Sequence, residues 1–129
     1  PRLLLSDGTE PKPAATGPAA AGALRGTPAS AGIVTGEARV VRDPVGARVE
    51  PGEILVAPST DPGWTPLFAQ ARGLVTDIGG ILAHGSIVAR EYGIPAVMGT
   101  GAATRRIRHG QLITVDGDRG VVHLTPQER

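Results

Sequence analysis

The sequence predicts a compact α/β domain with mainly β layers and two or three short helices. The 129-residue chain contains 19 Gly and 12 Pro but only one Trp, one Tyr and one Phe. Its core must therefore be built from Val, Ile, Leu and Ala, with many turns between short elements. Short β-branched runs bounded by Gly or Pro also outnumber the stretches that can form a helix. At this length there is room for one domain of ordinary size.

The first part of the chain differs in composition from the rest. Residues 6–24 are rich in Ala, Pro and Gly and show no apolar periodicity, which is typical of a linker. We therefore expect a tail from a preceding domain over residues 1–24 and a folded domain over residues 25–129. The chain starts with Pro, and we expect it to be a fragment of a longer protein.

Six segments have the composition of short buried strands. They are residues 38–41, 54–57, 74–76, 96–98, 112–115 and 121–124. The last two are separated by the run DGDRG over residues 116–120, which is typical of a turn between paired strands.

Two short helices are expected over residues 64–72 and 86–92, and residues 102–107 can form a third. Asp61 is placed to cap the first helix, and Gly73 is placed to end it. Gly93, with Pro95 beyond it, is expected to end the second helix.

Several classes of protein and site are disfavoured by the composition. The chain has no Cys, so that disulfides and thiolate metal sites are excluded. Its three histidines lack metal-ligand spacing, and Asp116 and Asp118 lack the other ligands of a calcium loop. His109 and His123 are most simply structural. We therefore expect no metal site in this domain.

The same composition bears on partners and localisation. No apolar run approaches the ~20 residues of a membrane span, and no secretory pattern opens the chain. We therefore expect no membrane partner and a cytoplasmic location. The net charge is +1, and the one dense basic run, residues 105–108, lacks aromatic neighbours for base stacking. A solvated surface is favoured for this run over a nucleic-acid site.

One histidine stands out by its surroundings. His84 follows the diglycine Gly79–Gly80 and directly precedes Gly85, near the expected start of the second helix. A phosphoryl acceptor must offer a nitrogen lone pair, and an ordinary imidazole is mostly neutral at pH 7. A helix N-terminus favours the neutral ring and also favours a phosphate once it is attached. The three glycines leave room for a bulky donor.

The polar neighbours of this histidine have more than one role open to them. Ser86 can cap the helix or bond a phosphate oxygen. Asp77 can orient the His84 ring by accepting its second N–H, although stabilisation of a turn is favoured. Arg90 either faces the site, pairs with Glu91 or contacts a neighbouring domain. On these residues alone, a purely structural role for His84 stays open.

The run GGILAHGSIVAREYGIPAVMG over residues 79–99 closely resembles the phosphohistidine motif of the mobile, swivelling domain of phosphoenolpyruvate-utilising enzymes. The resemblance extends from about residue 25 to residue 124. Residues 60–68 (TDPGWTPLF) and 84–93 are most similar to the C-terminal histidine domain of the rifampin phosphotransferases and their dikinase relatives. Many members have a Thr two residues before the histidine, and in the plant-type dikinases this Thr is a regulatory phosphorylation site. This chain has Leu82 at that position, so that control by phosphorylation there is not expected.

The resemblance implies the swivelling β/β/α fold and a part in a larger phosphotransferase. His84 would be the transiently phosphorylated residue. The residues that would position the phosphate are Gly79, Gly80, Gly85 and Ser86. The residues that would orient the His84 ring are Asp77 and Arg90.

The resemblance also implies partner domains in the same chain. An ATP-grasp domain would bind Mg²⁺ and ATP and load His84, and a second domain would hold the acceptor, rifampin-like or pyruvate. This domain would bind no cofactor itself and would not turn over alone. The alternatives are a fragment of phosphoenolpyruvate synthase or pyruvate phosphate dikinase, or a non-catalytic binding or regulatory module with the same fold.

Overall fold

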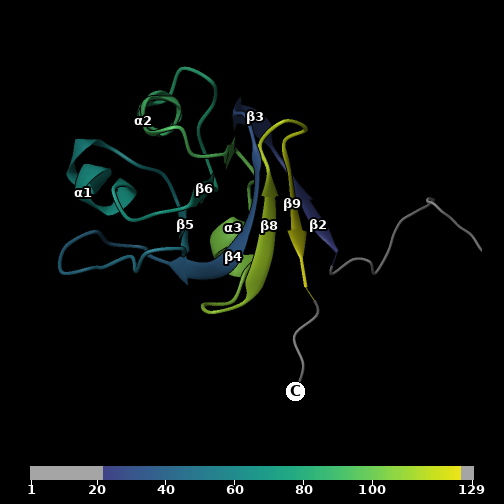
Figure 1. Ribbon diagram of the computed structural model, residues 1–129, viewed down its shortest axis with the longest axis horizontal. Helices are drawn as coiled ribbons and strands as arrows, with labels where there is room; N and C mark the ends of the chain where they lie inside the picture. Colours follow the sequence, from purple (N-terminus) through teal and green to yellow (C-terminus); the bar gives the residue numbers. More distant parts are fainter. Residues whose placement is uncertain (1–21, 126–129) are drawn as a thin grey trace, which may run out of the picture.

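The computed structural model describes residues 22–125 (Figure 1). Within these residues it contains eight strands and four short helical segments. The strands are β2 (Ala23–Arg25), β3 (Thr27–Ser30), β4 (Ile33–Val40), β5 (Ile54–Ala57), β6 (Gly73–Thr76), β7 (Ala96–Met98), β8 (Leu112–Asp116) and β9 (Val121–Leu124). The helical segments are the 3₁₀ helix η1 (Pro62–Trp64) and the α-helices α1 (Thr65–Phe68), α2 (His84–Tyr92) and α3 (Ala103–Arg106).

The strands form a single sheet in the order β2-β9-β8-β4-β5-β6-β7-β3. Strand β4 joins its two halves, because residues 33–37 pair antiparallel with β8 and residues 38–40 pair parallel with β5. Strands β5, β6 and β7 are parallel to one another, whereas β2, β9 and β8 are antiparallel. In Figure 1 the antiparallel strands stand beside the parallel ones, with α1 and α2 on the far side.

The parallel strands form the middle of three layers, because both of their faces are buried. All four residues of β5 are 0% exposed. Ile54 and Val56 belong to a core cluster with Ile113 of β8. The alternate residue Leu55 belongs to a second cluster with Phe68 of α1. Side chains alternate across a strand, so β5 contributes to both clusters. The predicted α/β class with β/β/α layers is therefore confirmed.

The two edge strands of the sheet are neighbours in the sequence. Strand β2 pairs with β9, β3 pairs with β7, and only Gly26 separates β2 from β3. A Cβ atom at Gly26 would collide with the carbonyl oxygen of Met98 and would lie 2.9 Å from Cγ1 of Val97. The chain crosses between the two halves of the sheet at a point where there is no room for a side chain.

The six expected strands are confirmed, with β4 starting at Ile33 instead of residue 38. Strands β2 and β3 were not predicted, because neither contains a β-branched run and both depend on backbone pairing with distant strands. Residues 1–21 of the expected tail lie outside the described residues, and its last two residues, Ala23 and Leu24, are part of β2.

The first expected helix is shorter than predicted. It consists of η1 followed by α1 and ends at Phe68 rather than residue 72. Asp61 caps it as expected, since its Oδ1 accepts a hydrogen bond of 2.8 Å from the Gly63 amide. Gly73 does not end the helix, because it is already the first residue of β6, where it pairs with Ile54 of β5. The chain must leave the helical conformation earlier to reach that strand.

The other two helices agree more closely with the sequence. Helix α2 begins at His84 and ends at Tyr92, and the left-handed φ of 73° at its C-cap, Gly93, allows the Gly93 amide to close the last turn. Helix α3 lies within the expected range. None of the helices in the described part of the chain is long and apolar enough to cross a bilayer.

An ion pair joins β4 to the residue before β5. Nε of Arg39 donates to Oε1 of Glu53 at 2.8 Å, and Nη2 donates to Oε2 at 3.2 Å. Burial raises the pKa of Glu53, but the hydrogen bonds from Arg39 and from the Glu50 amide outweigh it. The pKa of Glu53 is therefore below its ordinary value of 4.5.

We predict that Glu53→Gln lowers the free energy of unfolding at pH 7 by about 1 kcal/mol. Because the folded pKa is the lower one, the ionised carboxylate stabilises the fold above pH 4.5, and this contribution is lost as the pH falls through the folded pKa. Urea titrations of both proteins at neutral and acidic pH measure the difference. Glu50→Gln is the control, since the Glu50 side chain is more exposed than that of Glu53. The ion pair of Glu50 is also longer, with 3.5 Å between its Oε2 and Nη2 of Arg48. A difference that is independent of pH would contradict the prediction.

Candidate functional site

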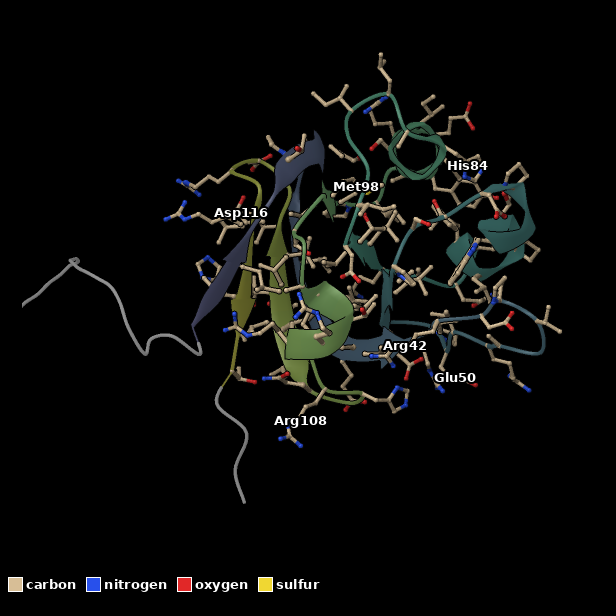
Figure 2. The ribbon with its side chains drawn as sticks, turned by 180° about the vertical axis from the view of Figure 1, so that it is seen from behind. Arg42, Glu50, His84, Met98, Arg108 and Asp116 are labelled. Atoms are coloured by element: carbon tan, nitrogen blue, oxygen red, sulfur yellow. The ribbon has the colours of Figure 1, made fainter. Side chains whose placement is uncertain are left out.

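The candidate site lies at the carboxyl ends of the parallel strands, where ligands commonly bind in open α/β sheets. Backbone hydrogen bonds tie the connections that leave these strands to one another. The Asp77 amide donates to Ala57 O at 3.1 Å, and the Thr100 amide donates to Thr76 O at 3.1 Å. The loop from β6 to α2 therefore starts from a fixed position. Figure 2 shows His84 at this end of the molecule, with Arg42 and Glu50 at the other.

His84 is the first residue of α2, and Ala83, with extended backbone, is the N-cap. No side chain caps this helix end. The amides of the first turn have no carbonyl partner within a helix, and the first intrahelical bond runs from the Ile87 amide to Ala83 O at 3.1 Å. The imidazole is thus attached at the positive end of a nine-residue helix.

The two nitrogens of the His84 ring differ in burial. The ring is half-buried, and the ring of Phe68 packs edge-on against it, with 6.3 Å between centroids. Nδ1 is buried and has no hydrogen-bond partner. Within the described residues, Nε2 has no hydrogen-bond partner either but is not among the buried polar atoms, so it is the accessible nitrogen of the ring.

Thr60 is a site residue that the sequence analysis missed. Among the described residues, its Oγ1 and Nδ1 of His84 are the two buried side-chain polar atoms without a hydrogen-bond partner. Thr60 Oγ1 also borders the first turn of α2, since it lies 2.5 Å from the position that a Cβ atom would take at Gly85. The two polar atoms without partners therefore belong to segments that meet at the first turn of α2. Only the pairing of distant segments could have shown this.

The three expected glycines have different surroundings. Gly79 adopts a φ of 126°, which side-chain-bearing residues rarely adopt. A Cβ at Gly80 would meet nothing within 4 Å, so the space beside this residue is open. A Cβ at Gly85 would lie 2.5 Å from Thr60 Oγ1 and 3.1 Å from Met98 Cε. The space beside Gly80 is therefore open, whereas the absence of a side chain at Gly85 allows α2 to pack closely against Thr60 and Met98.

Ser86 and Arg90 hold the loop before His84. Ser86 is fully buried, and its hydroxyl donates to Gly80 O at 2.6 Å. The Arg90 guanidinium donates to Ala29 O at 2.7 Å and to Ile81 O at 2.9 Å. Ser86 therefore does not cap α2, and the partners of Arg90 are two backbone carbonyls.

Asp77 is directed at α3. Its carboxylate accepts hydrogen bonds from the Thr104 amide at 2.9 Å and from the Thr104 hydroxyl at 2.6 Å. It forms no hydrogen bond with His84. This arrangement agrees with the turn-stabilising role that the sequence favoured.

The other two histidines are distant from these contacts. Nδ1 of His109 accepts a hydrogen bond of 3.3 Å from the Val40 amide, and His123 is exposed on β9. Within residues 22–125, no three His, Asp or Glu side chains gather in a way that could hold a metal ion.

Sequence comparisons relate the chain to a known family. The family model described as "PEP-utilising enzyme, mobile domain" matches residues 49–120. The chain is 50% identical to rifampicin phosphotransferase of Streptomyces sviceus, over 96% of this chain and 14% of that protein. It is 49% identical to phosphoenolpyruvate synthase of Aeropyrum pernix, over 78% of this chain and 12% of that protein. The chain thus spans a small part of the curated relatives that it matches.

Solved structures show the same fold. The solution structure of an Enzyme I protein matches with a TM-score of 0.54 and 35% identity, over 62% of this chain and 33% of that one. Aconitase X of Thermococcus kodakaraensis matches with a TM-score of 0.61, over 81% of this chain and 98% of that one. At 20% identity, the second match shows the fold alone.

We predict that Gly85→Ala lowers the free energy of unfolding by about 1–3 kcal/mol, because the new methyl group must displace Thr60 or Met98. Gly80→Ala is the matched control, since its methyl group would enter open space, and it should change the stability by less than about 0.5 kcal/mol. Thermal or urea unfolding of the two variants measures the difference. Equal stabilities of the two variants would contradict the close packing of Gly85 against Thr60 and Met98.

Proposed function

Because the chain belongs to the family of PEP-utilising enzyme mobile domains, we propose that it is the phosphohistidine carrier of a larger phosphotransferase. Nε2 of His84 attacks a phosphorus atom of ATP, so that an N–P bond forms while a P–O bond of the nucleotide breaks. An oxygen of the acceptor then attacks the same phosphorus, and the N–P bond breaks. A covalent intermediate divides one difficult transfer into two easier ones.

The unequal burial of the two ring nitrogens is the observation that supports this proposal. A nucleophilic imidazole needs a lone pair on the accessible nitrogen and the proton on the other. Nδ1 of His84 is buried, whereas Nε2 is not. The edge contact with Phe68 limits rotation of the ring. We therefore assign the phosphoryl group to Nε2.

Thr60 is proposed to hold the ring in the reactive tautomer. Its Oγ1 and His84 Nδ1 both lack partners, and a buried polar atom without a partner costs about 1–3 kcal/mol. The structure shows no hydrogen bond between these two atoms, and we propose that one forms from Nδ1–H to Thr60 Oγ1 in the reactive state, which satisfies the ring nitrogen and leaves the lone pair on Nε2. Thr60 is a positioning residue in this scheme.

The remaining site residues are proposed to shape the surroundings of the phosphate. The open space at Gly80 admits the donor, and Gly79 allows a backbone turn that side-chain-bearing residues rarely adopt. Gly85 lets α2 pack closely, while Ser86 and Arg90 fix the loop through its carbonyls. Free amides at the start of α2 favour the negative charge.

The donor and acceptor sites are proposed to lie on other domains of a longer chain. The relatives are several times longer than this chain, and the described residues contain no cluster for a metal ion. We propose that an ATP-grasp domain binds ATP with Mg²⁺ and that a further domain binds the acceptor. Such a carrier would work in the cytoplasm, where ATP is available.

The two ends of the described domain support a tethered movement. Residue 22 precedes β2 and residue 125 follows β9, and these two strands pair with each other. The Leu124 amide donates to Gly22 O at 2.9 Å. Connections to other domains would therefore leave from one place, beside β2 and β9, at the end of the strand order opposite to β6 and β7, the strands that flank α2 in the sequence.

The relatives suggest two different acceptors for the phosphoryl group. The names of the relatives indicate rifampicin as the acceptor in one case and phosphoenolpyruvate as the product in the other, for which we propose pyruvate as the acceptor. A non-catalytic module with this fold is the remaining alternative, and it predicts that His84 is never phosphorylated.

We predict that the full-length protein, incubated with Mg²⁺ and ATP, gains a phosphate that is stable at alkaline pH and lost in acid. His84→Ala should abolish this adduct, because it removes the nucleophile. His123→Ala, which changes an exposed histidine on β9, should retain it. Intact-mass spectrometry at alkaline pH measures the adduct. Its absence from the wild type, with ATP binding shown separately, would leave phosphoenolpyruvate as the donor or a non-catalytic module.

A second prediction concerns Thr60. Thr60→Val keeps the shape but removes the hydroxyl, and it should slow phosphorylation by about tenfold, as expected for the loss of one hydrogen bond of about 1.4 kcal/mol. Thr60→Ser is the control and should remain close to the wild type. Quench-flow gives the rates, and ¹⁵N NMR of the imidazole should show a lower fraction of the Nδ1–H tautomer in Thr60→Val. An unchanged tautomer ratio would remove Thr60 from the scheme.

A further inference from the structure

A pocket lies at the end of the domain opposite His84, where Figure 2 shows Arg42 and Arg108. Its volume is about 380 Å³, which falls within the range of small-molecule sites, about 300–1,000 Å³. The end of β4, the loop that follows it and the turn before β8 form its walls. We call it the arginine pocket. Its ionisable lining residues are Arg39, Arg42, Asp43, Arg48 and His109.

Arg42 is held in place without being neutralised. Its Nη2 donates to Thr104 O at 2.6 Å, and no carboxylate of the described residues pairs with it. Thr104 is itself fixed, because the Asp77 carboxylate accepts from its amide at 2.9 Å and from its hydroxyl at 2.6 Å. The remaining N–H groups of the Arg42 guanidinium have no partner within residues 22–125. A guanidinium in this state is preorganised to bind an anion through two parallel hydrogen bonds.

The other two arginines of the pocket are paired with glutamates. Arg39 donates to both carboxylate oxygens of Glu53, at 2.8 and 3.2 Å, and is therefore largely neutralised. Nη2 of Arg48 lies 3.5 Å from Oε2 of Glu50, and the two side chains are 80% and 51% exposed. An exposed pair at this distance is weak, so that Arg48 can turn toward a bound anion.

The segment that contains α3 and His109 makes the surroundings of the pocket positive. The connection from β7 to β8 contains no Asp or Glu, and it contains the basic run over residues 105–108. This run adjoins the pocket at both ends, since Thr104 binds Arg42 and His109 lines the wall. It supplies the excess of positive charge, because the two ion pairs are neutral and Arg42 is balanced by Asp43.

His109 adds an uncharged donor to the pocket. Its Nδ1 accepts from the Val40 amide at 3.3 Å, so that the neutral ring carries its proton on Nε2. Asp43, the carboxylate in the lining, accepts at Oδ1 from the Val45 amide at 3.0 Å. An anion that binds Arg42 must overcome the repulsion of Asp43, and a doubly charged ligand does so better than a singly charged one.

We propose that the arginine pocket binds a small phosphate-bearing molecule, with the phosphate group on Arg42 and His109. A phosphate has three acceptor oxygens for donors from two segments, and its charge of about −2 outweighs the repulsion of Asp43. The lining also includes Val41 and Ala47, which can contact an organic part of the ligand. Because the pocket is separate from His84, the phosphate group is bound there and not transferred. The inference therefore does not depend on the proposed carrier function.

The test is hydrogen exchange of the full-length protein, followed by mass spectrometry of the peptide that covers residues 41–48. The amides of this peptide should exchange about threefold or more slowly as inorganic phosphate is added, with the ionic strength held constant by chloride. A parallel titration with AMP distinguishes a nucleotide from free phosphate as the source of the group. Because neither compound donates a phosphoryl group to His84, failure of this test would leave the carrier function untouched.

Two neighbouring substitutions should change the dissociation constant of phosphate in opposite directions. Arg42→Gln should raise it by about tenfold or more, because a charge-assisted hydrogen bond is lost. Asp43→Asn should lower it by about threefold, because the repulsion is removed while the side-chain oxygen still accepts from the Val45 amide. Arg25→Gln is the matched control, since Arg25 is an exposed arginine of β2, and it should change the constant by less than about twofold.

The outcomes decide between a small ligand and other occupants. Protection by both compounds that is lost in Arg42→Gln would support a site for the phosphate group, and protection by AMP alone would support a nucleotide site. No protection by either compound would overturn the proposal. Protection that Arg42→Gln retains would indicate an adventitious ion only and would overturn it. Slow exchange without an added anion that Arg42→Gln releases would assign the pocket to acidic side chains of a neighbouring domain and overturn it as well.

Discussion

The burial of both faces of β5, β6 and β7 is the constraint on which the rest of this structure depends. Each residue of β5 is inaccessible to solvent, and its side chains alternate between the two core clusters. A parallel strand of this kind must be covered on both sides. The helices α1 and α2 cover one face, and the antiparallel strands with α3 cover the other. The crossing at Gly26 brings β2 and β3 to opposite edges of the resulting sheet.

This layering determines where chemistry can occur. The connections that leave the carboxyl ends of parallel strands meet at one edge, and here they bring together residues from three different segments. Thr60 follows β5, the loop to His84 follows β6, and Met98 ends β7. Their packing around Gly85 leaves one ring nitrogen buried and the other accessible.

The same region departs twice from the rules of a stable fold. It contains two buried polar atoms without partners, and it exposes four large apolar side chains, those of Ile78, Ile81, Leu82 and Ile87. Each departure reduces stability or solubility, and neither is needed to complete the layers. Local conflicts of this kind are expected where function requires them. Both are explained if the reactive histidine must be held in one tautomer and must meet a partner surface.

The sequence by itself determined the local features. The short β-branched runs predicted six strands, and the glycines before a helix start singled out His84, because backbone propensity and turn geometry depend on residues close in the chain. It did not determine β2, β3, the early end of α1 or the position of Thr60 beside α2. These depend on contacts between segments that are distant in sequence, such as the pairing of β2 with β9. The tertiary structure decided them, because only the packed layers establish which backbone edges remain to be paired and which side chains meet at the end of the sheet.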